Sequence, residues 1–450
     1  MDTGWAIVNT AAALVMGFAA AYFFICVGSG LVQLRRAGVR LGAQSKVSYG
    51  RPYDPKHGDP RGSGFEIYYL IPCLNEEAVI GATVSSLASA ELDFRIFVID
   101  DASDDDTGAI ASAAGGAQVT VVRRELPMAR LGKGAALNEG YAHVRADVAA
   151  RGLDPSKVLV CVMDADGRLS DGAVGAVTAL FEDDTVGGAQ LSVRIRNRST
   201  NFLLRFQDYQ FWTQSSLTQL GRMKTSSVSL GGNGQFARLS ALMELGDAPW
   251  TEALTEDLDL AISLAVRGWN LTTTPLASVD QQGIESLRPL IRQRTRWYQG
   301  HMMAMKRAPE VLGSPNVSHG ASIEMLLYLA VPWLFDLPWS ILYHLILIQI
   351  AITFAGVTAT ADPVIAWGSM AVVIYVLGFW PALITAVLAY RRDPEMGRLR
   401  TLAIGHSFLI TNYISYICAW RALFRIILRR NGWVKTSRVT EVPAAPATAS

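Results

Sequence analysis

The sequence predicts an α/β domain with a mostly parallel sheet, joined to α-helical transmembrane and interfacial helices. Short apolar runs alternate with helical stretches between about residues 64 and 306, as they do in α/β folds. Uncharged runs long enough to cross a hydrocarbon core of about 30 Å occur at the N-terminus and towards the C-terminus. Half of the 450 residues are hydrophobic, while the formal net charge is only +1. This balance argues against nucleic acid as a partner, because phosphate binding normally leaves a basic surplus.

The cysteines indicate neither a disulfide framework nor a zinc site. They lie far apart and form no C-x-x-C pair: Cys26, Cys73, Cys161 and Cys418. A reducing cytoplasm is the simplest setting for the α/β domain.

The N-terminal segment is predicted to be a transmembrane helix, residues 1–34, followed by a cytoplasmic linker, residues 35–64. The stretch from residue 3 to residue 34 contains no charge and lacks the basic start of a secretory signal. Arg35 and Arg36 follow it, so the positive-inside rule places the N-terminus outside and the next residues in the cytoplasm.

Two uncharged runs are predicted to form a transmembrane hairpin over residues 337–390, with arginines following on the cytoplasmic side. A third apolar run would place the basic tail outside if it crossed, so residues 391–430 are expected to be an interfacial or re-entrant helix. Residues 311–336 are expected to form an interfacial helix. The protein is therefore expected to be a multi-pass plasma-membrane protein whose α/β domain, residues 65–310, is cytoplasmic.

Four predicted strands of the α/β domain end in polar clusters. The strands are Ile67–Ile71, Phe94–Ile99, Val119–Val122 and Val158–Met163. Ligands of open parallel sheets bind beyond the carboxyl ends of the strands, so the four ends together predict one site. Any single cluster could also be an ordinary polar loop at the end of a strand.

Two motifs, one of them a strand-end cluster, are suited to a diphosphate and a divalent cation. Asp164 and Asp166 could share Mg²⁺ or Mn²⁺ with phosphate oxygens, because these ions favour hard oxygen ligands. Lys133 begins a helix after a glycine, where a cation beside helix N–H groups would hold phosphate. A solvated lysine in a Gly-rich turn is the alternative interpretation.

The segment Thr255-Glu256-Asp257 opens a predicted helix. The structural interpretation is that Thr255 caps the helix and that the two acids suit its dipole. The functional interpretation makes Asp257 a general base, because deprotonating a hydroxyl requires a carboxylate at the reacting centre.

A second helix, predicted over residues 287–305, carries Gln293, Arg296 and Trp297 at spacings i, i+3 and i+4. On one face, the guanidinium could neutralise a leaving diphosphate, the indole could stack on a sugar and the amide could orient either. Arg292 and Arg294 are expected to point elsewhere. A basic helix on anionic lipid is the alternative, which explains the arginines but not the paired Gln and Trp.

In order and spacing, these motifs resemble those of the membrane-bound family 2 glycosyltransferases, which include cellulose, hyaluronan, chitin-oligosaccharide and poly-N-acetylglucosamine synthases. The resemblance covers roughly residues 65–310. It implies a GT-A fold, a UDP-sugar donor, and inversion at the anomeric carbon.

The resemblance also implies roles for individual residues. Asp257 would be the base, with Glu256 and Arg296 also catalytic, and Asp164 and Asp166 would hold the metal. The implied donor-binding set is Pro72, Asn75, Glu76, Asp100, Asp101, Lys133, Asp164, Asp166 and Arg296. The implied acceptor-binding set is Gly232, Asn233, Gln235, Gln293 and Trp297, although many synthases carry a cysteine in the segment 231–236, where this chain has Gly and Asn. Residues 431–450 would contain a gating loop that includes Trp433, Lys435, Thr436 and Arg438, followed by a disordered tail.

Three functions are compatible with these motifs. A synthase that elongates a polysaccharide or oligosaccharide is favoured, with a glycolipid synthase next and a non-catalytic nucleotide-sugar binding protein last. The expected partners are a UDP-sugar, a glycan or lipid acceptor, and membrane lipids. Because only three spans are clear, export through a closed pore would need interfacial helices or a homo-oligomer. The sequence does not name the sugar.

Overall fold

The structure, a computed structural model, describes residues 2–39, 64–88, 94–357 and 363–430. Its centre is an eight-stranded sheet in the order β3-β2-β1-β4-β7-β6-β8-β5. The strands are β1 (Glu66–Cys73), β2 (Phe94–Asp100), β3 (Val119–Arg123), β4 (Val158–Val162), β5 (Arg168–Leu169), β6 (Val186–Ile195), β7 (Gln235–Arg238) and β8 (Asn270–Gln281). The four predicted strands are confirmed, and they form the parallel half of the sheet. Antiparallel β7 joins them to the parallel pair β6 and β8.

Helices cover both faces of the sheet, as strands that are apolar on both sides require. One core includes side chains of α4 (Lys133–Ala150) and α9 (Glu256–Arg267), and the other includes side chains of α2 (Ile80–Ala88), α3 (Thr107–Gly115) and α5 (Ala173–Thr178). The parallel register pairs Cys73 with Asp100 and Asp100 with Arg123, so the polar strand ends lie at one edge.

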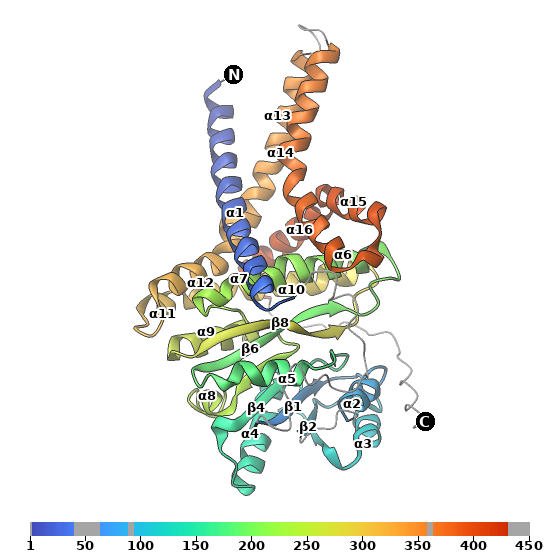
Figure 1. The fold of residues 1–450 in the computed structure, drawn as a ribbon, viewed down its shortest axis with the longest axis vertical. Coiled ribbons are helices and arrows are strands. Elements are labelled where there is room, and N and C mark those ends of the chain that lie inside the picture. The colour runs from blue at the N-terminus through green and yellow to red at the C-terminus, as the bar shows by residue number, and fades with distance from the viewer. Residues whose placement is uncertain (1, 40–63, 89–93, 358–362, 431–450) are drawn as a thin grey trace.

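A layer of helices lies between the sheet and the projecting helices (Figure 1). It contains α6 (Phe202–Gln210), the π-helical η7 (Phe211–Ser216), α7 (Leu217–Arg222) and α10 (Leu287–Ala304). The chain also forms two short helices outside this layer, α8 (Leu239–Met243) and α11 (Ala308–Gly313).

Helix α1 (Asp2–Arg36) crosses α7 at two glycines. A Cβ atom at Gly30 would lie 2.3 Å from the carbonyl oxygen of Leu217, and one at Gly221 would lie 2.2 Å from that of Cys26. Such backbone approach through small residues is typical of helix pairs in membranes. The N-terminal helix is thus packed directly onto the α/β domain.

Glu324 adds a polar contact to this junction. Its Oε1 accepts a hydrogen bond from the Tyr22 hydroxyl of α1 at 2.7 Å and pairs with Arg222 Nε of α7 at 2.6 Å. A charged residue on an apolar helix is costly unless it is paired. Glu324 therefore joins its own helix to α1 and α7.

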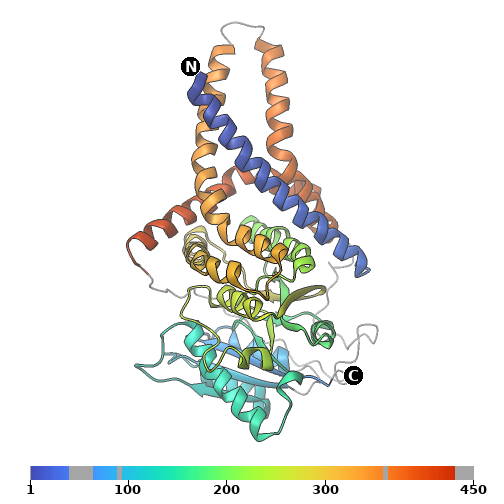
Figure 2. The same cartoon turned by 90° about the vertical axis from the view of Figure 1, so that its left-hand side faces the viewer.

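Three apolar helices project to the same side of the domain: α1, α13 (Leu337–Val357) and α14 (Pro363–Arg392) (Figures 1 and 2). By length and composition, two described helices could cross a membrane, Gly4–Arg36 and His319–Thr353. The second includes α12 (His319–Val331) and η10 (Pro332–Asp336), which run into α13 without a break. The boundary predicted at residue 336 thus lies inside one helical run, because Pro332 is accommodated by a π-helical turn.

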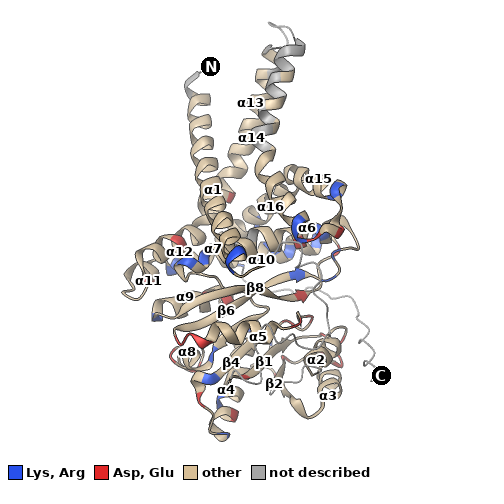
Figure 3. Cartoon of the chain, in the orientation of Figure 1, with Lys and Arg blue, Asp and Glu red and all other residues tan. Residues whose placement is uncertain are grey.

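The predicted interfacial segment 391–430 is a bent pair, α15 (Arg398–His406) and α16 (Phe408–Ile427), with an angle of 47° between them. Such a pair is either one broken span or a re-entrant loop. Residues 3–34 of α1 carry no charge, whereas basic side chains gather around α6, α10 and α15 (Figure 3). The predicted gating residues, 433–438, lie outside the described residues.

Candidate active site

Lys133, the first residue of α4, reaches into the centre of the site. Its Nζ donates hydrogen bonds to Asp164 Oδ1 at 2.6 Å and to the carbonyl oxygen of Gly232 at 2.8 Å, and it lies 4.0 Å from Glu256 Oε1. Burial lowers the pKa of Lys133, but the carboxylates of Asp164 and Glu256 outweigh burial, and the pKa is raised overall. The lysine is therefore a fixed positive charge at neutral pH.

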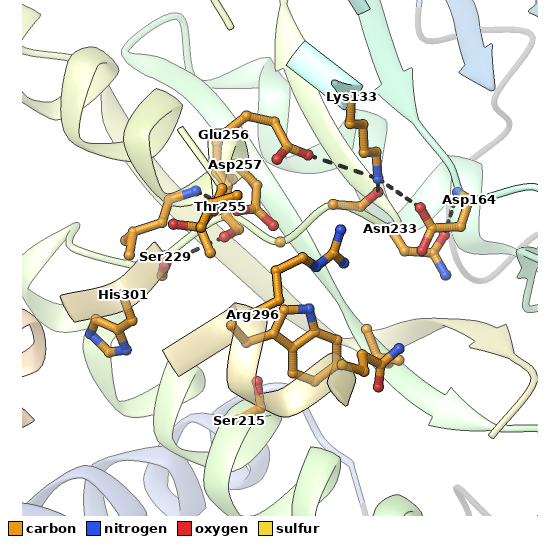
Figure 4. Close-up of a pocket in the computed structure, with 18 of the residues that line it drawn as sticks. Lys133, Asp164, Ser215, Ser229, Asn233, Thr255, Glu256, Asp257, Arg296 and His301 are labelled. Carbon is orange, nitrogen blue, oxygen red and sulfur yellow. Dashed lines mark hydrogen bonds and ion pairs between the residues drawn. The ribbon is translucent and has the colours of Figure 1, made fainter. Parts of the chain in front are cut away.

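Glu256 and Asp257 begin α9 beside this lysine (Figure 4). A Cβ atom at Gly232 would lie 2.7 Å from Lys133 Nζ, 3.4 Å from Asp257 Oδ2 and 3.7 Å from Glu256 Oε1, so the three groups converge on one point. Burial, followed by the neighbouring Asp257, raises the pKa of Glu256 to about 7. Burial also raises the pKa of Asp257.

Thr255 precedes the two acids at the N-cap position, but its side chain makes no capping hydrogen bond. Its Oγ1 is buried without a hydrogen-bond partner among the described residues. Capping therefore does not account for this threonine. Instead, Gly300 of α10 packs against it, and a Cβ atom at Gly300 would lie 2.5 Å from Thr255 Cγ2.

This glycine contact lets α10 pass close to the start of α9. As a result, Gln293, Arg296 and Trp297 line the same cavity as the two acids. The guanidinium of Arg296 points towards the acids in Figure 4, and its charge lowers the pKa of Glu256 and Asp257 against the larger effect of burial.

The cavity has a volume of about 550 Å³ and joins two different parts of the protein. At one end it is lined by strand-end residues such as Pro72 and Asp101. At the other end it is lined by Val331, Pro332 and Asp336, which lie in the candidate membrane span His319–Thr353.

Most of the predicted donor-binding residues line the cavity: Pro72, Glu76, Asp101, Lys133, Asp164 and Arg296. Asn75 and Asp100 are not among the lining residues. Asp100 is buried and pairs with Arg123 at 2.5 Å, while Asn75 Oδ1 accepts a hydrogen bond from the Asp104 N–H at 2.7 Å. Both residues thus hold the loops that surround the site.

The two predicted metal ligands have different environments. Asp164 lines the cavity, where Lys133 holds one of its oxygens. Asp166 is fully buried, does not line the cavity, and its Oδ2 accepts a hydrogen bond from the Gln282 N–H at 2.8 Å. Within the described ranges no group of three or more His, Cys, Asp or Glu residues is arranged to hold a metal ion. The position of Asp164 fits a cation shared with a ligand, and that of Asp166 does not.

The predicted acceptor floor is held in place by Gln190, whose Oε1 accepts a hydrogen bond from the Gly231 N–H at 2.6 Å. Gly232 and Asn233 line the cavity, and Asn233 Oδ1 accepts a hydrogen bond from the Asp164 N–H at 3.2 Å. Gln235 is buried in β7 and does not line the cavity.

Several residues that line the end of the cavity near the candidate membrane span were not predicted from the sequence, among them Arg294, His301 and Tyr328. The expectation that Arg294 points away from Trp297 is wrong, because its guanidinium lies 4.8 Å from the Trp297 ring centroid. Burial lowers the pKa of His301 to about 4, so this histidine is neutral. The helical spacing of 294, 297 and 301 could have revealed a second lining face, because these positions are three or four residues apart.

Residues 64–300 match the glycosyltransferase-like family 2. A β-monoglucosyldiacylglycerol synthase of Synechocystis is 32% identical over 244 residues, which are 52% of this chain and 47% of that protein. A poly-β-1,6-N-acetyl-D-glucosamine synthase of Staphylococcus aureus is 28% identical over 243 residues, which are 52% of this chain and 54% of that protein. The chain thus spans about half the length of these curated relatives.

Among solved structures, a mannosyltransferase from Pyrobaculum calidifontis in complex with GDP-Man and Mn²⁺ is similar, with a TM-score of 0.49 and 18% identity. The match covers 89% of this chain and 99% of that chain. Glucosyl-3-phosphoglycerate synthase from Mycobacterium tuberculosis with Mn²⁺, UDP and glucosyl-3-phosphoglycerate matches with a TM-score of 0.36 and 22% identity, over 58% of this chain and 86% of that chain.

Proposed function

The chain belongs to glycosyltransferase-like family 2, and we propose that it transfers a sugar from a UDP-sugar to a hydroxyl group of a membrane lipid. Membership of this family supports a nucleotide-sugar glycosyltransferase with a GT-A fold over the non-catalytic alternative. One observation carries the choice of acceptor: a single cavity joins the Lys133 and Asp257 end of the site to a helix that could cross the membrane.

The proposed reaction is a single inverting displacement. The acceptor oxygen attacks the anomeric carbon, its proton passes to Asp257, and the bond between the anomeric carbon and the diphosphate oxygen breaks. The electron pair of that bond leaves with UDP, whose added negative charge is stabilised by Lys133 and Arg296. No covalent sugar–enzyme intermediate is required.

Asp257 is the better candidate base of the two acids. Burial and the neighbouring Asp257 raise the pKa of Glu256 to about 7, which favours its protonated form. Asp257 Oδ1 also accepts a hydrogen bond from the Leu258 N–H at 2.7 Å, which favours its ionised form. We assign to Glu256 the supporting role of a partly protonated neighbour beside Lys133.

Asp164, which lines the cavity, would hold a divalent cation such as Mg²⁺ or Mn²⁺. When bound, it would neutralise charge on the leaving group. The burial of Asp166 suits a different role, because its hydrogen bond to Gln282 supports the loop that leads from β8 to α10.

Two observations favour a lipid acceptor over a growing polysaccharide. The cavity ends among residues of a candidate membrane span, so a headgroup could reach Asp257 from the bilayer. In addition, the β-monoglucosyldiacylglycerol synthase has a higher sequence identity to this chain than the polymer synthase. Polymer elongation is retained as the second candidate function.

The proposed arrangement places the α/β domain at the cytoplasmic membrane surface of the cell, with the N-terminus outside. The domain boundaries at residues 64 and 310 belong to this proposal. The Gln299 Nε2 of α10 donates a hydrogen bond to the Arg430 carbonyl oxygen at 2.9 Å, and a gating role for the residues after 430 stays a prediction.

The test uses purified full-length protein in detergent, labelled UDP-sugars and diacylglycerol lipids. Transfer should yield an organic-soluble monoglycoside, whereas a long water-soluble polymer would establish the second candidate instead. Asp257→Asn should lower turnover by about a thousandfold while UDP binding by calorimetry changes by less than about twofold. Glu252→Gln, an exposed acid near the site, serves as the control. Near-normal turnover of Asp257→Asn would refute its role as base.

A further inference from the structure

Arg294 is a half-buried cation whose guanidinium has no counter-ion in the described part of the chain. Among the described residues it has no ion-pair partner within 4.0 Å, and its Nε and Nη2 atoms are buried without hydrogen-bond partners. Two aromatic rings flank it: the guanidinium carbon lies 5.3 Å from the Phe211 ring centroid and 4.8 Å from that of Trp297. Cation–π contacts contribute about 1–2 kcal/mol each, less than the several kcal/mol that burying a charge costs.

Arg294 and Arg296 serve opposite ends of the cavity. Arg296 acts on Glu256 and Asp257, next to Lys133. Arg294 instead lies against Phe211 of η7 and near Tyr298 and Cys418, the latter from the membrane-side helix α16. The donor diphosphate has its own cations at the Lys133 end, so the acceptor is the remaining source of an anion for Arg294.

Arg294 remains able to bind an anion. Burial lowers the pKa of Arg294 to about 10, so the group stays protonated at neutral pH. Arg294 lines the cavity. Its Nη1 atom, unlike Nε and Nη2, is not among the buried atoms that lack a hydrogen-bond partner. Asp336, the acid that η10 contributes to this end, accepts a hydrogen bond from Tyr298 and makes no ion pair with Arg294.

We infer that Arg294 binds a phosphate group of the acceptor, which makes the acceptor an anionic phospholipid with a free headgroup hydroxyl. This inference rests on the proposed transfer to lipid and narrows its substrate class. The guanidinium would hold the phosphodiester at the membrane-side end of the cavity, while the hydroxyl beyond it reaches Asp257. A guanidinium contributes strong, charge-assisted hydrogen bonds to phosphate.

The experiment compares phosphatidylglycerol with diacylglycerol as acceptors in mixed micelles, using the full-length protein and the UDP-sugar that gives the highest turnover. The wild type should use phosphatidylglycerol at least about tenfold better in kcat/KM. Arg294→Gln should remove this preference by slowing only the phosphatidylglycerol reaction. Arg292→Gln, an exposed arginine of the same helix, should leave both reactions unchanged. Equal use of the two lipids by the wild type, or equal losses in Arg294→Gln, would overturn the inference.

Lipid binding is measured separately, so that failure of lipid glycosylation can be distinguished from failure of the anion site. Native mass spectrometry in the absence of the UDP-sugar measures how many phosphatidylglycerol molecules and how many diacylglycerol molecules stay bound to each variant. Lower retention of phosphatidylglycerol by Arg294→Gln than by Arg292→Gln supports the site, even if no lipid accepts sugar. Equal retention by the two variants overturns it.

Discussion

Gly300 provides a stringent test of how the site is assembled, because the contact between α9 and α10 leaves no room for a side chain there. In Gly300→Ala, the new methyl group would lie 2.5 Å from Thr255 Cγ2 and 2.8 Å from its Oγ1. An ordinary contact needs about 3.5 Å, so α10 must move away from α9 by about 1 Å. Overpacking of this kind costs about 1–3 kcal/mol of folding stability. A displacement of about 1 Å between Arg296 and Asp257 would also lower turnover by about a hundredfold.

The assay measures UDP release under saturating substrates, together with the melting temperature in detergent. Gly320→Ala is the matched control, because the nearest atom to its Cβ position is 4.0 Å away, on Thr225. That variant should keep wild-type turnover and gain slightly in stability, since alanine favours a helix over glycine. The double variant Gly300→Ala/Thr255→Ala removes the clashing atoms and should recover turnover relative to Gly300→Ala, with Thr255→Ala alone as the reference. Near-normal turnover of Gly300→Ala, or no recovery in the double variant, would refute this account of the assembly.

Three further predictions follow from the charges of the site and the membrane junction. Lys133→Gln should weaken UDP binding by at least about tenfold in calorimetry, because it removes the cation held by Asp164; unchanged affinity would contradict a diphosphate role. Raising the pH from 5 to 8 should lower the free energy of unfolding by up to about 3 kcal/mol through Glu256. The pKa of this group rises from 4.5 to about 7 on folding, so the native state retains a proton that the unfolded chain loses in this pH range. Thermal melting of Glu256→Gln should lack this part of the pH dependence, and identical pH profiles would count against it. Glu324→Gln should lower the free energy of unfolding by about 3–5 kcal/mol, because it leaves the buried Arg222 charge unpaired. A decrease in melting temperature of less than about 2 °C would disprove this prediction.

Much of the fold could be predicted from the sequence, since local patterns determine it. The strands from Ile67, Phe94, Val119 and Val158 are short apolar runs, and their burial on both faces requires helices on both sides. The uncharged length of α1 likewise identifies an apolar helix without any tertiary information. The antiparallel β7 and the helices α6 and α7 were not predicted, because they depend on contacts between distant segments. The helix α10 was predicted, but its packing beside α6 and α7 was not.

The sequence by itself also determined which residue types could perform the chemistry, because the acid pair Glu256-Asp257, the strand-end Asp164 and the helical Arg296 and Trp297 each form a local motif. Only the tertiary structure decided which of the predicted residues reach the cavity. Asp100, Asp166 and Gln235 do not line it, because pairing, burial and strand position direct them elsewhere. Arg294 does line it, because the cavity extends past α10 to Val331, Pro332 and Asp336 in the candidate membrane span. The physical reason is that a motif fixes the spacing of side chains along one helix or strand, whereas the wall of a cavity is set by how several elements pack together.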